Sequence, residues 1–175
     1  MAFSLVITPD HGWLLLVLVA IGLECFVIGF AVVARARKQV FNKEFMETHF
    51  GDLHFKETKT HVRPLGYPDM GNGRYSQKLS YKDWVYFNNA QRAHYNLVEQ
   101  IAAFVIMTLI GGIVYPFYAT IAGVAFFVGR LLYCFYVTKE GAAHPLRNTG
   151  ALLGDFALLG AMGLSIMSAI KIIQS

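Results

Sequence analysis

The sequence predicts an all-α integral membrane protein, a four-transmembrane-helix bundle with up-down topology in a single domain over residues 1–175. Hydrophobic residues make up 55% of the chain and charged residues only 15%, which is too apolar for an ordinary soluble domain. A length of 175 residues favours one domain. Four apolar segments are long enough to cross a bilayer of roughly 30 Å. They cover approximately residues 12–34, 95–115, 117–137 and 150–173.

Local signals place the helix ends and the connections between the segments. No basic residue precedes the first segment and several follow it, so we expect a retained helix and not a cleaved signal peptide. Ser80 is a predicted N-cap for a helix that begins well before the second span, with Asp83 in its first turn. Pro116 predicts a tight hairpin between the second and third spans. The segment 46–80 has no clear period and is expected to be a loop.

The charge distribution predicts the orientation of the bundle in the membrane. The net charge is +4, and residues 35–92 contain eleven of the fifteen Lys and Arg residues. This clustering indicates a membrane-proximal face and not a nucleic-acid-binding arm. We therefore expect the long loop 35–82 and the 138–149 connection in the cytosol, with both termini on the opposite side. The basic residues near the span ends are Arg35, Arg37, Lys38, Lys43, Lys78, Lys82, Arg92, Lys139 and Arg147.

Three polar residues form a stripe on the predicted second helix. Arg92, Asn96 and Glu99 are separated by four and then three residues, so they share one helical face. Such groups close to hydrocarbon are unfavourable unless they face a cavity, a partner or a ligand. Together they complement a small zwitterion, which favours a binding role. The alternative is a structural role in which neighbouring helices satisfy the charges, because Arg92 and Glu99 lie about 10 Å apart along the axis and are expected to be too distant for a direct bond.

A second polar stripe occurs in the third span, where Arg130, Tyr133 and Tyr136 are three residues apart. Arg130 could extend to the cytosolic edge and the tyrosines could be interfacial residues. Both stripes are predicted at the same depth, however, and a shared depth allows them to line one pocket. The two interpretations stay open on the sequence alone.

Three further cations lie next to the spans. Arg147 precedes the fourth span, in the predicted loop, and a guanidinium beside a cysteine-containing ligand would favour thiolate over thiol. Arg37 and Lys38 follow the first span. All three are also compatible with a simple role as orientation signals.

Two carboxylates are predicted inside the membrane, Glu24 in the first span and Asp155 in the fourth. They could pair across the bundle, pair across an oligomer axis, or belong to a proton path. Cys25 and Cys134 are expected to be packing residues. No metal site is expected, because the histidines show no metal-ligand spacing.

The second-span motif resembles that of the membrane-associated proteins in eicosanoid and glutathione metabolism. It is most similar to the type 3 branch of the microsomal glutathione S-transferases, and leukotriene C4 synthase is a near relative. The resemblance covers all four spans in order. The similar stretches are Phe87-Asn88, Gln91-Arg92-Ala93-His94-x-Asn96-x-x-Glu99, Gly129-Arg130-Leu-Leu-Tyr133, Ala36-Arg37-Lys38, and the Gly150 to Gly160 run of the fourth span.

The resemblance implies a homotrimer in the endoplasmic reticulum (microsomal) or outer mitochondrial membrane. Glutathione would bind as co-substrate at the subunit interfaces on the cytosolic side, with Arg92 on a carboxylate and Glu99 on the ammonium group. Arg37, with Lys38 as a substitute, would come from the neighbouring subunit. Arg147 and Arg130 would be the catalytic residues that hold the thiolate. The implied glutathione-binding residues are Arg92, His94, Asn96, Glu99, Tyr133, Tyr136, Arg37 and Lys38.

The implied activity is that of a glutathione transferase or peroxidase, in which the thiolate attacks a lipophilic electrophile or a lipid hydroperoxide. One alternative is a non-catalytic, lipid-presenting scaffold like the 5-lipoxygenase-activating branch of the family. That branch lacks the motif arginine and glutamate, and this chain has both Arg92 and Glu99. A more remote alternative is a small transporter that uses Glu24 and Asp155.

Overall fold

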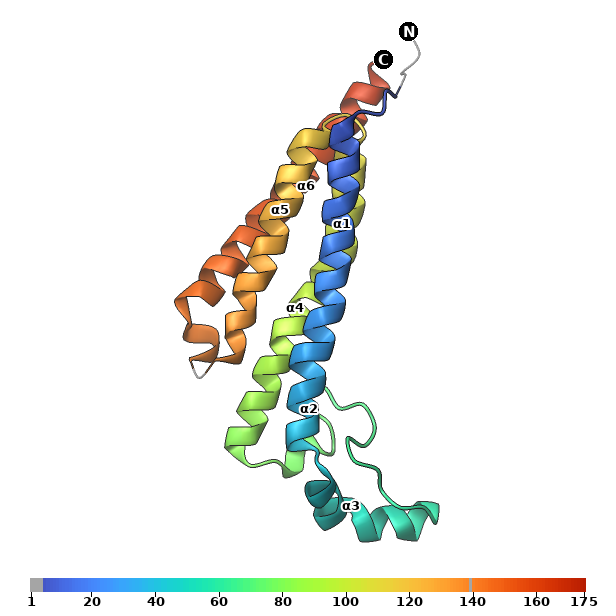
Figure 1. Cartoon of the computed structure of the whole chain (residues 1–175), viewed down its shortest axis with the longest axis vertical. Helices are drawn as coiled ribbons and strands as arrows, with labels where there is room; N and C mark the ends of the chain where they lie inside the picture. Colours follow the sequence, from blue (N-terminus) through green and yellow to red (C-terminus); the bar gives the residue numbers. More distant parts are fainter. Residues whose placement is uncertain (1–4, 139) are drawn as a thin grey trace.

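The four-helix membrane bundle predicted from the sequence is confirmed. The structure is a computed structural model that describes residues 5–138 and 140–175, and every regular element in these ranges is helical. Lys139, one of the basic residues that predicted the orientation, lies outside the described residues. The first long helix begins and the last one ends at the same end of the bundle, here called the terminal end, and the segment between the first two long helices lies at the other, here called the loop end (Figure 1). Among the described residues, four helical stretches are long and apolar enough to cross a membrane: Pro9–Val40, Tyr81–Gly112, Pro116–Val137 and Pro145–Ile173.

The first helical stretch is longer than the predicted span 12–34. It consists of α1 (Pro9–Ile28), a π-helical segment (Gly29–Ala34) and α2 (Arg35–Val40). No Gly or Pro occurs between residues 30 and 40, so the helix continues past the apolar segment. The basic residues after the span therefore lie on a helix and not, as predicted, in a loop.

The predicted loop over residues 46–80 is wrong for its first part, because α3 (Lys43–Thr58) occupies it. Asn42 caps this helix by accepting a hydrogen bond from the backbone N–H of Phe45, at 2.9 Å. Met46 and Phe50 of α3 are buried in a cluster with Phe41. Their spacing of four residues places both on one helical face, and this packing stabilises a helix that has little apolar periodicity otherwise.

The caps of the next two helices follow the prediction. α4 (Tyr81–Gly112) begins after Ser80, whose hydroxyl accepts a hydrogen bond from the backbone N–H of Asp83. Pro116 is the first residue of α5 (Pro116–Tyr133), and only a short turn separates the two helices. A 3-10 turn (Cys134–Val137) extends α5 toward the loop end.

The last helix, α6 (Pro145–Ile173), begins earlier than the predicted position 150. Pro145 occupies its first position, where no backbone N–H is needed, and the ring nitrogen of His144 accepts a hydrogen bond from Leu146 at 3.2 Å. Arg147 consequently lies in the first turn of α6 and not in a loop.

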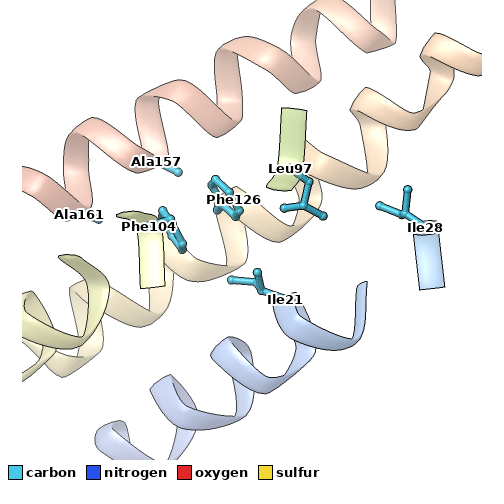
Figure 2. Packing of buried hydrophobic residues seen from close by; sticks show 7 residues of the cluster. All are labelled: Ile21, Ile28, Leu97, Phe104, Phe126, Ala157 and Ala161. Carbon is cyan, nitrogen blue, oxygen red and sulfur yellow. The ribbon is translucent and has the colours of Figure 1, made fainter. Parts of the chain in front are cut away.

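The core of the bundle lies between all four long helices (Figure 2). The rings of Phe104 and Phe126 stack at its centre, with centroids 3.9 Å apart. On the outer faces many large apolar side chains are exposed, including Trp13, Phe26 and Phe156. This distribution suits a bundle whose outer surface contacts lipid. The buried core residues are Ile21, Ile28, Leu97, Phe104, Phe126, Ala157 and Ala161.

Backbones of α5 and α6 approach closely near the loop end. A Cβ atom on Gly129 would lie 2.8 Å from the backbone nitrogen of Gly154 and 3.0 Å from the carbonyl oxygen of Gly150. Further toward the terminal end, the hydroxyl of Ser168 in α6 donates a hydrogen bond to the carbonyl of Gly111 in α4, at 2.9 Å. Small residues and buried hydroxyls of this kind are typical of helix packing in membranes.

Candidate functional site

Two charged residues of the polar stripe on α4 form an ion pair with each other. Nη1 of Arg92 lies 3.7 Å from Oε1 of Glu99, and both side chains are nearly half exposed. The sequence-based expectation that these groups are too distant for a direct bond is therefore wrong. Although the residues are about 10 Å apart along the axis, two long side chains that extend toward each other cover the gap. Asn96, between them on the stripe, does not share this ion pair.

Arg130 of α5 connects the two polar stripes. Its side chain is only 1% exposed, and its Nη1 donates a hydrogen bond to Oδ1 of Asn96. The guanidinium lies over the ring of Phe126 at 5.1 Å and over the ring of Tyr133 at 5.3 Å. The stripes of α4 and α5 thus meet at one depth in the bundle.

Arg147 of α6 joins the same group from the loop end. Its Nη2 donates a hydrogen bond to the hydroxyl of Tyr133 at 3.1 Å. Its guanidinium lies 4.8 Å from the ring centroid of Tyr133 and 4.9 Å from that of Tyr136. We call the residues joined in this way the arginine–tyrosine cluster: Asn96, Arg130, Tyr133, Tyr136 and Arg147.

The arginine–tyrosine cluster is a cationic site with spare donors. Within residues 5–138 and 140–175, no carboxylate forms an ion pair with Arg130 or Arg147. Nε and Nη2 of Arg130 and Nε of Arg147 are buried and have no hydrogen-bond partner in this part of the chain. Guanidinium groups are permanently charged and bind carboxylates, phosphates and thiolates well. The arrangement is therefore suited to stabilising an anion.

Arg37 and Lys38 do not reach this cluster within one chain. The guanidinium of Arg37 donates hydrogen bonds to the backbone carbonyls of Asp69, at 3.0 Å, and Leu65, at 2.7 Å, and a further one to Tyr67. Arg37 therefore holds the 65–69 segment against α2. Lys38 is exposed.

His94 also lies apart from the other residues of the second-span motif. Its Nε2 is 3.8 Å from Sγ of Cys25, and its ring faces Gly29 at the start of the π-helical segment. It is two residues from both Arg92 and Asn96, so it occupies a different face of α4. In this chain His94 packs between α4 and α1.

Asp69 organises the loop, a role that the sequence analysis did not assign. Its carboxylate is buried and accepts hydrogen bonds from the backbone N–H groups of Gly71, Gly73, Tyr75 and Ser76, at 2.9–3.1 Å, and from the hydroxyl of Ser76. Burial by itself would raise the pKa of Asp69, but the hydrogen bonds from Ser76 and the glycine backbones outweigh it and lower the pKa below its ordinary value. The Asp-x-Gly-x-Gly spacing was the available signal.

The Asp69 loop is fastened to α4 as well as to α2. Nε2 of Gln91 donates to the carbonyl of Asp69 at 3.3 Å, and Nε1 of Trp84 donates to the carbonyl of Gly71 at 2.9 Å. Gln91 is part of the second-span motif, so one motif residue is used to hold this loop. The loop thus covers the loop end of α2 and α4 as an ordered element.

Two membrane carboxylates lie at the margins of the cluster. Oδ1 of Asp155 accepts a hydrogen bond from Nε2 of Gln100 at 3.2 Å. Glu24 is only 5% exposed, and neither of its oxygens has a hydrogen-bond partner among the described residues. Both act electrostatically on Arg130 without a direct ion pair. The sequence indicated that carboxylates inside the spans are energetically unfavourable, but it did not indicate that both act on Arg130.

An apolar groove lies on the outer face between α5 and α6. Its volume is about 480 Å³, and it is lined mainly by aliphatic, aromatic and small residues, among them Ile121, Ala125, Leu153 and Phe156. Leu153 and Phe156 flank Gly154 and Asp155, so the groove extends toward the depth of Arg130. It is a surface that an alkyl chain in the bilayer can occupy.

Comparison with known proteins identifies the relationship that the second-span motif indicated. The MAPEG family, whose name denotes the membrane-associated proteins in eicosanoid and glutathione metabolism, matches residues 14–167. This range contains every residue of the arginine–tyrosine cluster. No solved structure matches the chain. The family consists of four-helix membrane bundles and includes glutathione transferases and peroxidases as well as non-catalytic members. With most of its length matched, the chain belongs to the MAPEG family.

Proposed function

We propose that this protein is a membrane-bound glutathione transferase that also reduces lipid hydroperoxides. The observation that carries the proposal is the pair of guanidiniums, Arg130 and Arg147, that meet at Tyr133 and form no ion pair with a carboxylate in the described part of the chain. A scaffold without chemistry has no need for two buried or half-buried cations with spare donors. A glutathione-dependent enzyme needs such groups to hold a thiolate.

The α4 stripe supplies the recognition of glutathione in this proposal. Arg92 binds a carboxylate of the tripeptide and Glu99 binds its ammonium group. In the structure these two side chains pair with each other and are nearly half exposed. A zwitterionic ligand replaces each partner with a group of the same sign, so the exchange leaves neither charge unpaired. Asn96, Tyr133 and Tyr136 contribute polar contacts beside them, and His94 positions α4 against α1.

Arg147 is the group that we assign to the thiolate, with Arg130 behind it. A free thiol has a pKa of about 8.5, and a guanidinium that lowers this value by one unit raises the thiolate fraction roughly tenfold at neutral pH. Arg147 occupies the first turn of α6, where the helix N-terminus adds a favourable field for an anion. No side-chain nucleophile takes part.

The reaction forms one bond to sulfur and breaks one in the lipophilic substrate. In the transferase reaction the thiolate attacks an electrophilic carbon, a C–S bond forms, and the leaving group or alkoxide takes up the proton that the thiol released. In the peroxidase reaction the thiolate attacks the terminal oxygen and the O–O bond breaks, which gives an alcohol after protonation. The glutathione sulfur carries away the terminal oxygen as a sulfenic acid. A second glutathione then converts this sulfenic acid to the disulfide and water. The groove between α5 and α6 admits the lipophilic substrate from the bilayer.

We propose a homotrimer as the working state. Arg92 and Glu99 are nearly half exposed inside a helix long enough to span the membrane. Charges that face lipid are unfavourable, and a second copy of the chain can cover them. Glutathione then lies between subunits. Lys38, which is exposed, is better placed than Arg37 to reach a neighbour's site, because Arg37 already binds the Asp69 loop.

The basic residues support the predicted orientation, with the loop end in the cytosol and both termini on the other side. Glutathione is then supplied from the cytosol while the second substrate comes from the membrane. We place the protein in the endoplasmic reticulum or the outer mitochondrial membrane on the basis of the type 3 resemblance.

The test is to purify the protein in detergent and to measure glutathione binding by calorimetry. Conjugates with a lipophilic electrophile and alcohols from a lipid hydroperoxide are then detected by mass spectrometry. We expect saturable glutathione binding and at least one of the two products. A folded protein that binds a lipid but not glutathione would contradict the proposal and place this chain with the non-catalytic members of the family.

A further inference from the structure

Two carboxylates inside the helical spans have no part in the proposed chemistry. Glu24 of α1 is buried and accepts no hydrogen bond from the described residues. Asp155 of α6 is held by Gln100 of α4, whose Nε2 donates to it at 3.2 Å. A carboxylate at this depth is unfavourable unless it compensates another charge. Asp155 is the one that the fold holds in a defined position.

The packing of α5 against α6 brings Asp155 to the depth of Arg130. A Cβ atom at Gly154 would overlap the Arg130 guanidinium, so the α6 backbone lies directly against that group. Gly129, next to Arg130, meets the α6 backbone at the same Gly154. Asp155 follows Gly154 immediately, and its hydrogen bond to Gln100 directs it toward α4, the helix whose Asn96 accepts a hydrogen bond from Arg130.

Arg130 needs a compensating charge. It is 1% exposed, permanently cationic, and its hydrogen-bond acceptor Asn96 is neutral. The groups that act on Arg130 electrostatically are Asp155, Tyr133, Glu24 and Cys134, and among these only Asp155 and Glu24 carry a carboxyl group. These groups come from α6, α5, α1 and the turn after α5, and α4 contributes only neutral amides here.

We propose that Asp155 is a positioning residue that acts through Arg130 and sets the strength of the positive field at the glutathione thiol. This inference rests on the proposed function. Asp155 is exposed and acts on the guanidinium electrostatically, without an ion pair between them, so it reduces the net charge of the site but leaves the spare donors of Arg130 available. The thiol proton is then released at a higher pH than the two arginines alone would allow.

A more basic thiolate is a stronger nucleophile, so this moderation favours attack on weak electrophiles. Nucleophilicity falls with the pKa of the thiol, with a Brønsted coefficient of about 0.4–0.5. Loss of the Asp155 charge therefore produces more thiolate at low pH but a less reactive one. Asp155 is predicted to change the pH profile of the reaction more than the affinity for glutathione.

The test uses the purified full-length protein with glutathione, and the absorbance of bound thiolate is titrated against pH. Asp155→Asn keeps the shape and the acceptor for Gln100 but removes the charge. We expect its titration midpoint to move to lower pH, with about threefold more thiolate below the wild-type midpoint, which corresponds to half a pKa unit. The glutathione Kd should change by less than about twofold, because the carboxylate and ammonium contacts are elsewhere. Asp155→Glu, which keeps the charge, should titrate close to the wild type.

The outcomes separate this inference from the proposed function. Wild-type protein that fails to bind glutathione overturns both. Normal glutathione binding by Asp155→Asn with an unchanged midpoint overturns the role of Asp155 alone, as does an equal loss of thermal stability in the Asn and Glu variants without any shift. If Asp155→Asn does not fold, Asp155→Ser removes the same charge with a smaller side chain, and the same comparison applies.

Discussion

Asp69 and Arg130 are both buried charged groups, but the protein treats them differently. Asp69 is 4% exposed and its carboxylate accepts hydrogen bonds from four backbone N–H groups and one hydroxyl. Arg130 is 1% exposed and donates to a single acceptor, Asn96, while two of its nitrogens have no partner among the described residues. The hydrogen-bonding capacity of the Asp69 carboxylate is filled, whereas Arg130 has donors that are not used.

The difference separates a structural charge from a functional one. A saturated carboxylate can only hold its loop, because any ligand would have to displace several hydrogen bonds. An arginine that is fixed by rings and packed backbone, but whose donors are not all used, keeps its positive field and its free donors for an anion bound next to it. A weaker form of this contrast applies to Arg37 and Arg147. Arg37 donates to three loop carbonyls, whereas Arg147 donates to Oδ1 of Asn148 and to the hydroxyl of Tyr133 and keeps a buried Nε without a partner among the described residues.

The largest effect is expected from Asp69→Asn. The amide replaces one accepting oxygen with a donor that faces N–H groups, so the variant should lose on the order of 2–4 kcal/mol of stability in the loop. Limited proteolysis of residues 59–80 and thermal unfolding in detergent measure this loss. Asp52→Asn in exposed α3 is the matched control and should behave like the wild type. If the loop of Asp69→Asn resisted proteolysis as the wild-type loop does, the claim that the Asp69 carboxylate holds the loop would be wrong.

The next effect concerns the α4 stripe. Arg92→Ala and Glu99→Ala should each weaken glutathione affinity by about 1.5–3 kcal/mol, the range for hydrogen bonds to charged groups. Calorimetry measures the affinity, and size-exclusion chromatography checks that the assembly is retained.

A charge exchange separates recognition from structure at the same stripe. The double variant R92E/E99R restores an ion pair but reverses the polarity that the ligand meets. If the stripe recognises glutathione, the double variant should bind no better than the single ones. Two results would show instead that the stripe has a structural role, in which Arg92 and Glu99 serve to pair with each other. One is recovered glutathione binding in the double variant. The other is loss of assembly in the single variants while the folded protein keeps its normal affinity for glutathione.

A smaller effect is expected from Gly154→Ala. The new methyl group would overlap the Arg130 guanidinium, so Arg130 must leave its present position, at a cost of about 1–2 kcal/mol. Gly160→Ala on the same helix is the control, since no atom lies within 4 Å of its added Cβ. Thermal unfolding and thiolate titration compare the two. Equal behaviour of both variants would mean that the position of Arg130 does not matter.

The smallest effect is the acid response of the loop. Because the pKa of Asp69 is lowered in the folded state, its hydrogen bonds contribute fully above the ordinary carboxyl value of about 4 and are lost as the pH falls through the lower folded value. Loop proteolysis should therefore increase only below that ordinary value. Asp69→Asn should lack this step, and a wild-type loop that opens between pH 5 and pH 7 would contradict the assignment.

Most of the bundle could be predicted from the sequence, because span length, hydropathy and caps such as Ser80 and Pro116 are local signals. α3 could not, since its stability depends on Met46 and Phe50 packing against the distant Phe41. The start of α6 was missed because the polar first turn, with Arg147, does not share the hydropathy of the span.

The candidate site was predictable as two stripes but not as a connected cluster. The helical period assigned Asn96 to the polar stripe of α4 and Arg130 to that of α5. The hydrogen bond between them depends on how α4 packs against α5, which the period does not encode. The Arg92–Glu99 distance was misjudged because axial rise ignores side-chain length. Asp69 and Arg37 meet across a long sequence separation, which no local pattern encodes.

The central claim is that the arginine–tyrosine cluster holds glutathione as a thiolate, and Arg147→Ala tests it most directly. Thiolate absorbance of bound glutathione is titrated in the wild type and in this variant, with Kd measured in parallel and Arg147→Lys as the control that keeps the charge. We predict a midpoint at higher pH in Arg147→Ala, roughly tenfold less thiolate at neutral pH, partial recovery in Arg147→Lys, and a nearly unchanged Kd. An unchanged midpoint in Arg147→Ala, with glutathione bound normally, would contradict the claim.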